Sequence, residues 1–169
     1  MIRNFNDKTP KVAASVFVSE AAYIIGDVEI GNDSSVWPGA VIRGDFGAIK
    51  IGQSSHIEDN CVLHAYAQGL TIGDNVLLGH GAIVECHKIG SNVLIGNNAT
   101  ILGDCEIGNF CIIGANSVVT QGTKIPDYSF VTGVPAEIVG NSSPKQLWWT
   151  TEGTKAYSSL AKEYKKQGL

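Results

Sequence analysis

The feature that most constrains this chain is an aliphatic residue that returns at every sixth position between Val12 and Val131. The register slips three times, in nine-residue steps across GDFGA and AYAQG and in a five-residue step into Ile89. The following residue is often glycine, as at Gly31 and Gly52, and the residue four positions on is usually small. A short repeat sustained over this length predicts a solenoid, in which each repeat packs only against its neighbours.

A period of six predicts an all-β solenoid, specifically a left-handed parallel β-helix of about seven coils. Three hexads would make one triangular coil, with the aliphatic residues stacked inward and small residues at the corners. Coils would stack at the strand spacing of about 4.8 Å. An antiparallel sandwich would instead need alternation of period two and hairpin turns, and Asn-Gly and Asp-Gly signals are missing.

Counting hexads in threes assigns each aliphatic residue to one of three faces of the coil. The first face carries Val12, Ile30, Ile51, Ile72, Ile89 and Ile107. The second face carries Val18, Val36, Ile57, Leu78, Ile95 and Ile113. The third face carries Ile24, Ile42, Leu63, Val84, Ile101 and Val119. Both nine-residue steps then add a bulge at the same corner, between the third face and the first.

The chain after the repeat predicts a helix. GVPAEIVGNSSP resembles a linker, and Ser143 followed by Pro144 suits an N-cap and first helical position. An apolar stripe from Leu147 to Tyr164 favours a helix, weakened at Gly153, that lies along the β-helix or joins an oligomer interface. We therefore expect a β-helix domain over 1–140 and a helix packed on it over 141–169.

Composition excludes several classes of protein. With 44% hydrophobic and 17% charged residues the chain is too apolar for disorder, and its net charge of −4 lacks the basic footprint of a nucleic-acid binder. No signal peptide or membrane span is evident, so we expect a cytoplasmic protein that binds neither nucleic acid nor membrane. Cys61, Cys105 and Cys111 fall at the small inward position and suit the core, whereas Cys86 falls outside it and is a candidate thiol near the site.

All four histidines lie between His56 and His87, and the register brings two of them toward carboxylates. The residue after each inward aliphatic points outward, so Arg43, His64 and Glu85 should stack in three consecutive coils. His80 would lie around a corner, in a glycine turn. His64 and Glu85 from one chain and His80 from a neighbour could then hold one metal ion in a trimer.

Two histidines and one carboxylate suit zinc or iron(II). A nearby Glu58 could take a proton from a bound water or orient it. His87 could replace Glu85 as the third ligand if the short coil bends. Arg43 with Asp45 suits a structural salt bridge at an interface, and His56 is expected to be a solvated surface residue.

These motifs together resemble the gamma-class carbonic anhydrase family of hexapeptide-repeat proteins. The matching elements are GDVEIG, VWPGAVIRGD, IEDNCVLH, LTIGDNVLLGH, GVPA and the C-terminal helix. The resemblance implies a homotrimer with metal sites between protomers, His64 and His80 as ligands from neighbouring chains, and Arg43 and Asp45 at the interface. It implies reversible hydration of carbon dioxide to bicarbonate by a metal-bound hydroxide, with zinc first and iron or cobalt as alternatives.

The chain departs from the family pattern in and around the expected ligands. Glu85 stands where the family has its third histidine ligand, and His56 and Glu58 replace an asparagine and a glutamine. Extra carboxylates should hold a dication well but weaken it as a Lewis acid and repel bicarbonate. Two alternatives therefore stay open, a non-catalytic trimeric metal-binding protein and a hexapeptide-repeat acyltransferase that uses acyl-CoA.

Overall fold

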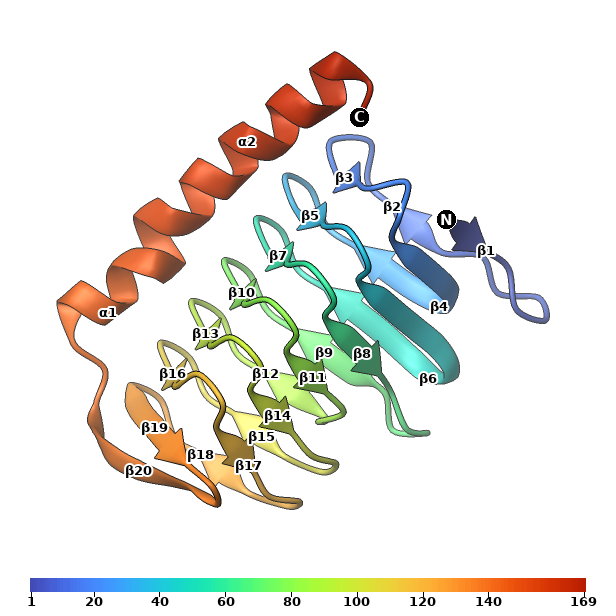
Figure 1. Cartoon of the computed structure of the whole chain (residues 1–169). Helices are drawn as coiled ribbons and strands as arrows, with labels where there is room; N and C mark the ends of the chain where they lie inside the picture. Colours follow the sequence, from blue (N-terminus) through green and yellow to red (C-terminus); the bar gives the residue numbers. More distant parts are fainter.

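The computed structural model describes residues 1–169 as a left-handed parallel β-helix of about seven coils with a helical segment along one side (Figure 1). Its strands form one sheet of twelve strands and one of eight. The larger sheet contains the first and third faces, because two long strands, Tyr23–Ile30 and Val41–Ile51, turn the corner between them.

The third face contains the two long strands, four short strands and an N-terminal strand that pairs with the first long strand. These are β1 (Ile2–Arg3), β4 (Tyr23–Ile30), β6 (Val41–Ile51), β8 (Val62–His64), β11 (Ile83–Val84), β14 (Thr100–Ile101) and β17 (Val118–Val119). The first face adds β2 (Lys11–Val12), β9 (Leu70–Ile72), β12 (Lys88–Ile89), β15 (Glu106–Ile107) and β18 (Lys124–Ile125). The second face has β3 (Phe17–Val18), β5 (Ser35–Val36), β7 (His56–Ile57), β10 (Leu77–Leu78), β13 (Leu94–Ile95), β16 (Ile112–Ile113), β19 (Ser129–Gly133) and the antiparallel β20 (Ala136–Asn141).

The strand register confirms the assignment of hexads to faces. On the third face Leu63 pairs with Ile42 on one side and with Val84 on the other. On the first face Ile89 pairs with Ile72 despite the five-residue step. The coil is one residue shorter at the corner before β12, so the register within the strands is kept. The stacked aliphatic side chains form one buried core of 33 residues. Burial of these apolar side chains is the main favourable term in folding.

The cysteines all belong to this core. Cys61, Cys105 and Cys111 are buried as expected. The expectation for Cys86 is wrong: its side chain turns inward at the short corner and is 1% exposed. Burial raises the pKa of Cys86 to about 12, so its thiol takes no part in a surface site.

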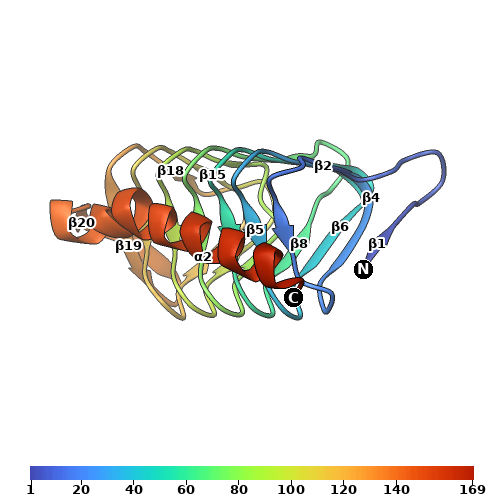
Figure 2. The same cartoon turned by 90° about the horizontal axis from the view of Figure 1, so that it is seen from above.

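The helical segment consists of α1 (Pro144–Trp148), a π-helical turn η1 (Trp149–Gly153) and α2 (Thr154–Gln167). Ser143 caps α1, and the Gln146 side chain returns a contact to the Ser143 backbone, which confirms the predicted start. Gly153, where the sequence predicted a weakened helix, is the last residue of the π-helical turn. The segment runs parallel to the axis of the β-helix and crosses successive coils, so α2 contacts β3, β5 and β7 in turn (Figure 2). None of the helices has the length and apolar character needed to cross a membrane.

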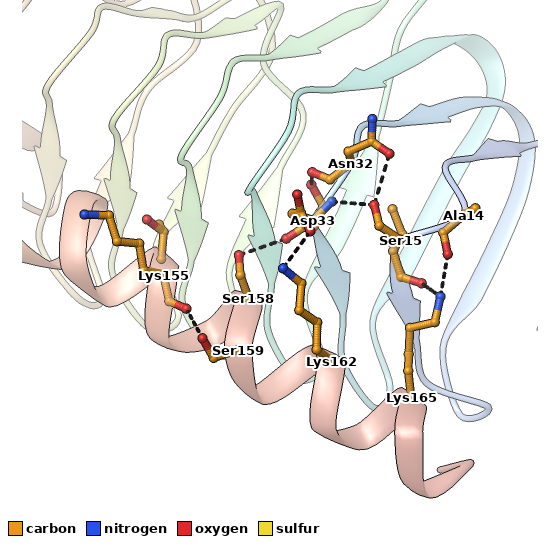
Figure 3. A network of polar contacts seen from close by, with 12 residues as sticks. Ala14, Ser15, Asn32, Asp33, Lys155, Ser158, Ser159, Lys162 and Lys165 are labelled. Atoms are coloured by element: carbon orange, nitrogen blue, oxygen red, sulfur yellow. Dashed lines mark hydrogen bonds and ion pairs between the residues drawn. The ribbon is translucent and has the colours of Figure 1, made fainter.

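Two sets of contacts hold α2 against the second face. Phe17 and Trp37 pack against Tyr157, Ala161 and Tyr164 from the helix. Polar contacts lie at the opposite edge, where Lys162 pairs with Asp33 at 3.1 Å and Lys165 donates to the Ala14 carbonyl at 2.6 Å (Figure 3). The helix therefore covers residues of the second face that would otherwise point into water.

Candidate functional site

The outward column on the third face begins with Arg43, which pairs in register with His64 of the next coil. Glu85 follows one coil further, directly after β11. His64 Nδ1 lies 3.9 Å from Glu85 Oε1. The β-helix register thus brings together the His64 and Glu85 side chains that the sequence placed in one column.

Asp45 fixes the other side of the His64 ring. Its Oδ1 lies 3.2 Å from His64 Nε2, and its Oδ2 accepts a hydrogen bond from Arg43 at 2.6 Å. Burial opposes ionisation of Asp45, but the hydrogen bond and charge of Arg43 outweigh it, and the pKa of Asp45 is lowered. The ionised carboxylate favours the tautomer with the proton on Nε2, which leaves the Nδ1 lone pair facing Glu85.

His80 occupies the turn between Gly79 and Gly81, at the corner that joins the second face to the third. Gly81 has φ +71°, and a Cβ on it would lie 2.3 Å from Asn98, so glycine is required there. His80 Nε2 lies 2.9 Å from Glu58 Oε2, and His80 Nδ1 lies 2.9 Å from Asp59 Oδ2. The imidazole is half exposed and is held between two carboxylates.

Glu58 is the more buried of the two carboxylates that contact His80, with 3% of the residue exposed. It accepts a hydrogen bond from the backbone N–H of His80 at 3.2 Å. Burial and hydrogen bonding to Glu58 raise the pKa of Tyr157, which reaches Glu58 from α2. The helix therefore contributes a phenol to the surroundings of His80.

His64 and His80 lie at opposite corners of the third face in a single chain. His64 ends β8 where the chain leaves this face, and His80 precedes β11 where the chain enters it. No group of three or more His, Cys, Asp or Glu side chains in one chain is arranged to hold a metal ion. The pair His64–Glu85 and the pair His80–Glu58 are consequently two separate half-sites.

Two histidines lie apart from both half-sites. His87 is exposed, and its Nδ1 contacts the Gly69 carbonyl at 3.2 Å rather than His64. The expectation that His56 is a solvated surface residue is wrong, since His56 is fully buried under α2. Its Nε2 donates to the Thr154 carbonyl at 2.9 Å, and its ring stacks on Tyr157.

The His64 half-site has donors that suit a divalent metal. Two ligands of a tetrahedral zinc ion lie about 3.4 Å apart, which is close to the separation of His64 Nδ1 and Glu85 Oε1. Nitrogen and carboxylate oxygen also suit iron(II). The half-site alone can supply two protein ligands, His64 and Glu85.

Three residues near the half-sites, Phe46, Tyr66 and Tyr157, were not predicted from the sequence to lie there. Phe46 and Tyr66 hold their rings against His64, with centroids 5.9 and 5.7 Å away. They belong to the nine-residue steps, so the extra residues at that corner were the available signal. Tyr157 had no such signal, because its position depends on how the helix packs.

Comparison with known proteins agrees with the hexapeptide repeat. The family model described as "Bacterial transferase hexapeptide (six repeats)" matches residues 86–121, and "Hexapeptide repeat of succinyl-transferase" matches residues 69–102. The chain is 36% identical to an acetyltransferase candidate of Bacillus cereus whose solved structure superposes with a TM-score of 0.94 over 99% of this chain and 98% of that one.

Curated relatives extend the comparison to named functions. A Methanocaldococcus jannaschii protein named "Probable carbonic anhydrase" is 45% identical, over 89% of this chain and 95% of its own length. The carnitine operon protein CaiE of Escherichia coli is 36% identical, over 92% of this chain and 80% of its own. "Gamma carbonic anhydrase 2, mitochondrial" of Arabidopsis thaliana is 33% identical over 95% of this chain, which spans only 60% of that protein's length. Fold, motifs and relatives together show that the chain belongs to the gamma carbonic anhydrase-like family of hexapeptide-repeat proteins.

Proposed function

We propose that this protein is a metal-dependent carbonic anhydrase-like enzyme, active as a homotrimer in the reversible hydration of carbon dioxide. The observation that carries the proposal is the division of the donors into two half-sites at opposite corners of one face. Neighbouring copies around a threefold axis would bring His64 and Glu85 of one chain to His80 of the next. The relatives named as carbonic anhydrases support the same reaction.

The outward residues of the third face suit contact with another copy. Tyr23, Val62 and Ile83 stack in separate coils and remain 37%, 38% and 39% exposed. A row of exposed apolar residues on a regular face is typical of an interaction surface. Both half-sites border this row, so the face that would be buried in the trimer is also the face that carries the donors.

A divalent metal, with zinc first and iron or cobalt as alternatives, would be held by His64, Glu85 and His80 and would supply a water that ionises near neutral pH. Asp45 orients His64, and Arg43 holds Asp45 ionised. Glu58 is placed to accept and hold a proton at its carboxylate. Phe46 and Tyr66 shield His64 from bulk water.

Acyl transfer is the second candidate, favoured by the 36% identity to the Bacillus cereus acetyltransferase candidate. The coils of this chain carry no long catalytic loop, and Lys and Arg side chains do not gather near His64 or His80 to hold the phosphates of coenzyme A. Consumption of acetyl-CoA in the presence of amine or hydroxyl acceptors, without carbon dioxide hydration, would favour this candidate over the first.

The first test is the metal content of the purified protein together with its mass in solution. We expect about one zinc, iron or cobalt per chain in a trimer, and carbon dioxide hydration by that form. His64→Ala and Glu85→Ala should lose metal while the trimer stays folded. His87→Ala is the matched control and should keep metal, because the His87 ring contacts the Gly69 carbonyl and not His64 or Glu85. Metal retained in all three variants would contradict the ligand assignment.

A second test separates the role of Glu58 from metal binding. Glu58→Gln keeps the size of the side chain and restores the amide that the family carries there. If Glu58 accepts a proton, the variant should retain its metal while kcat falls by about 10²-fold or more. Unchanged kcat would limit Glu58 to holding His80 in place, and loss of metal would make it part of the ligand set.

A further inference from the structure

Phe46 is the most exposed large apolar residue of the structure, with 74% of its surface in contact with solvent. It sits in the first nine-residue step, and its ring lies edge-on to His64. No aromatic or aliphatic side chain of the same chain covers its outer face. An exposed phenylalanine beside a candidate site indicates that something else packs against it.

A groove with a matching character lies beside the other half-site. It has a volume of about 420 Å³, and its floor contains Leu77, Leu94 and Ile112, which pair in register on the second face. Trp149 and Tyr157 wall one side. His80 and Glu58 also line the groove, which contains no Lys, Arg or Asp side chain.

The π-helical turn shapes this groove. Gly153 ends the turn, and a Cβ at that position would lie 3.1 Å from the Trp149 ring. The Trp149 indole therefore packs on Gly153 and lies beside the groove. Trp149 is itself 48% exposed, so the groove is lined but not filled by its own chain.

We propose that Phe46 of one copy inserts into the groove beside His80 of the neighbouring copy and closes the shared site. This inference rests on the proposed function, in which the corner that carries His64 in one copy meets the corner that carries His80 in the next. Phe46 lies against His64, and the groove is lined in part by His80. The same approach of the two corners therefore brings the exposed Phe46 ring to the apolar lining of the groove. The contact would bury the phenylalanine and exclude water from the metal on the side that leads to solvent.

Cross-linking between copies tests the placement directly. A full-length protein with Phe46→Cys and Leu94→Cys should form covalent oligomers with a short bifunctional maleimide. The four native cysteines are buried, so they should not react. Each single variant should stay uncoupled or nearly so, and Tyr128→Cys with Leu94→Cys is the matched control, because Tyr128 is exposed at the corner away from the third face.

The strength of association gives a second readout. Phe46→Ala should weaken assembly by about tenfold or more in the dissociation constant, since a buried aromatic ring is lost at each interface. Tyr128→Ala should leave assembly unchanged. A trimer that holds metal but shows no coupling between positions 46 and 94 would overturn this inference alone. A monomer without metal would overturn it together with the proposed function.

Discussion

His56 shows how a single side chain can depend on an element far away in the sequence. His56 immediately precedes Ile57, which points into the core, so the repeat turns the His56 side chain outward. Its Nδ1 accepts from Ser35 Oγ at 2.8 Å, and its Nε2 reaches the helix backbone at Thr154. Burial outweighs the hydrogen bond to Thr154 and lowers the pKa of His56 to about 4. The folded protein therefore requires the neutral imidazole.

This requirement predicts a loss of stability in weak acid. The unfolded chain binds a proton at His56 near pH 6.5, whereas the folded chain does so only near pH 4. The free energy of unfolding should thus fall as the pH drops from 6.5 toward 4 and then level off. Between pH 7 and pH 4.5 the native protein should lose about 2–3 kcal/mol more than His56→Gln, as measured by urea denaturation. The exposed His87→Gln should behave like the native protein, and equal losses in His56→Gln would contradict the assignment.

The same comparison shows what the sequence could predict at the scale of residues. In a solenoid the register converts sequence distance directly into stacking, so Arg43, His64 and Glu85 could be placed in one column before the structure was known. The burial of His56 could not, because the repeat says only that the side chain leaves the core. Whether it then meets water or a helix depends on packing that the repeat does not encode.

At the scale of elements, the helix decides which outward face is covered. Leu77 and Ile112 point outward from the second face yet are each 4% exposed. Val62 and Ile83 hold the equivalent position on the third face and are 38% and 39% exposed. The sequence predicted the helix and its start from Ser143 and Pro144. The sequence did not distinguish a helix packed along the β-helix from a helix in an oligomer interface, because an apolar stripe suits both.

The capping box at Ser143 gives a prediction for this element. Ser143→Ala removes the side-chain oxygen that accepts from the Gln146 N–H, and it should destabilise the start of the helix by about 1 kcal/mol. Trypsin should then cleave faster after the exposed Lys145, while α2 remains held by Trp37 and Tyr164. Ser159→Ala, in the middle of α2 and exposed, is the matched control and should not change the cleavage rate. Equal rates in all three proteins would mean that the cap contributes little.

At the scale of the whole molecule, the placement of the donors matters more than their number. His64 and Glu85 belong to one corner of the third face and His80 to the other, so each proposed site takes its ligands from two chains. In a closed ring of three chains this arrangement has a direction, because every copy gives one half-site to the next copy and the other half-site to the previous one. A site that lay within one chain would have no such direction.

Mixed trimers should reveal this direction. Trimers made only of His64→Ala chains, or only of His80→Ala chains, have no complete site. When the two variants are co-expressed in equal amounts, a His80→Ala chain supplies His64 and Glu85, and a neighbouring His64→Ala chain supplies His80. Every mixed trimer then contains one complete site, so random assembly should restore about one quarter of the native metal content and activity.

A matched pair of variants distinguishes this restoration from a general effect of mixing. His64→Ala and Glu85→Ala alter the same half-site, so no arrangement of these two chains in a trimer rebuilds it. Their co-expression should leave metal content and carbon dioxide hydration at the level of the separate variants. Restoration in this control pair would show that Glu85 is dispensable as a ligand, and a lack of restoration in the first pair would contradict a site shared between chains. The outcome depends only on which residues share a chain, so it tests the assembly independently of how efficient the altered site is.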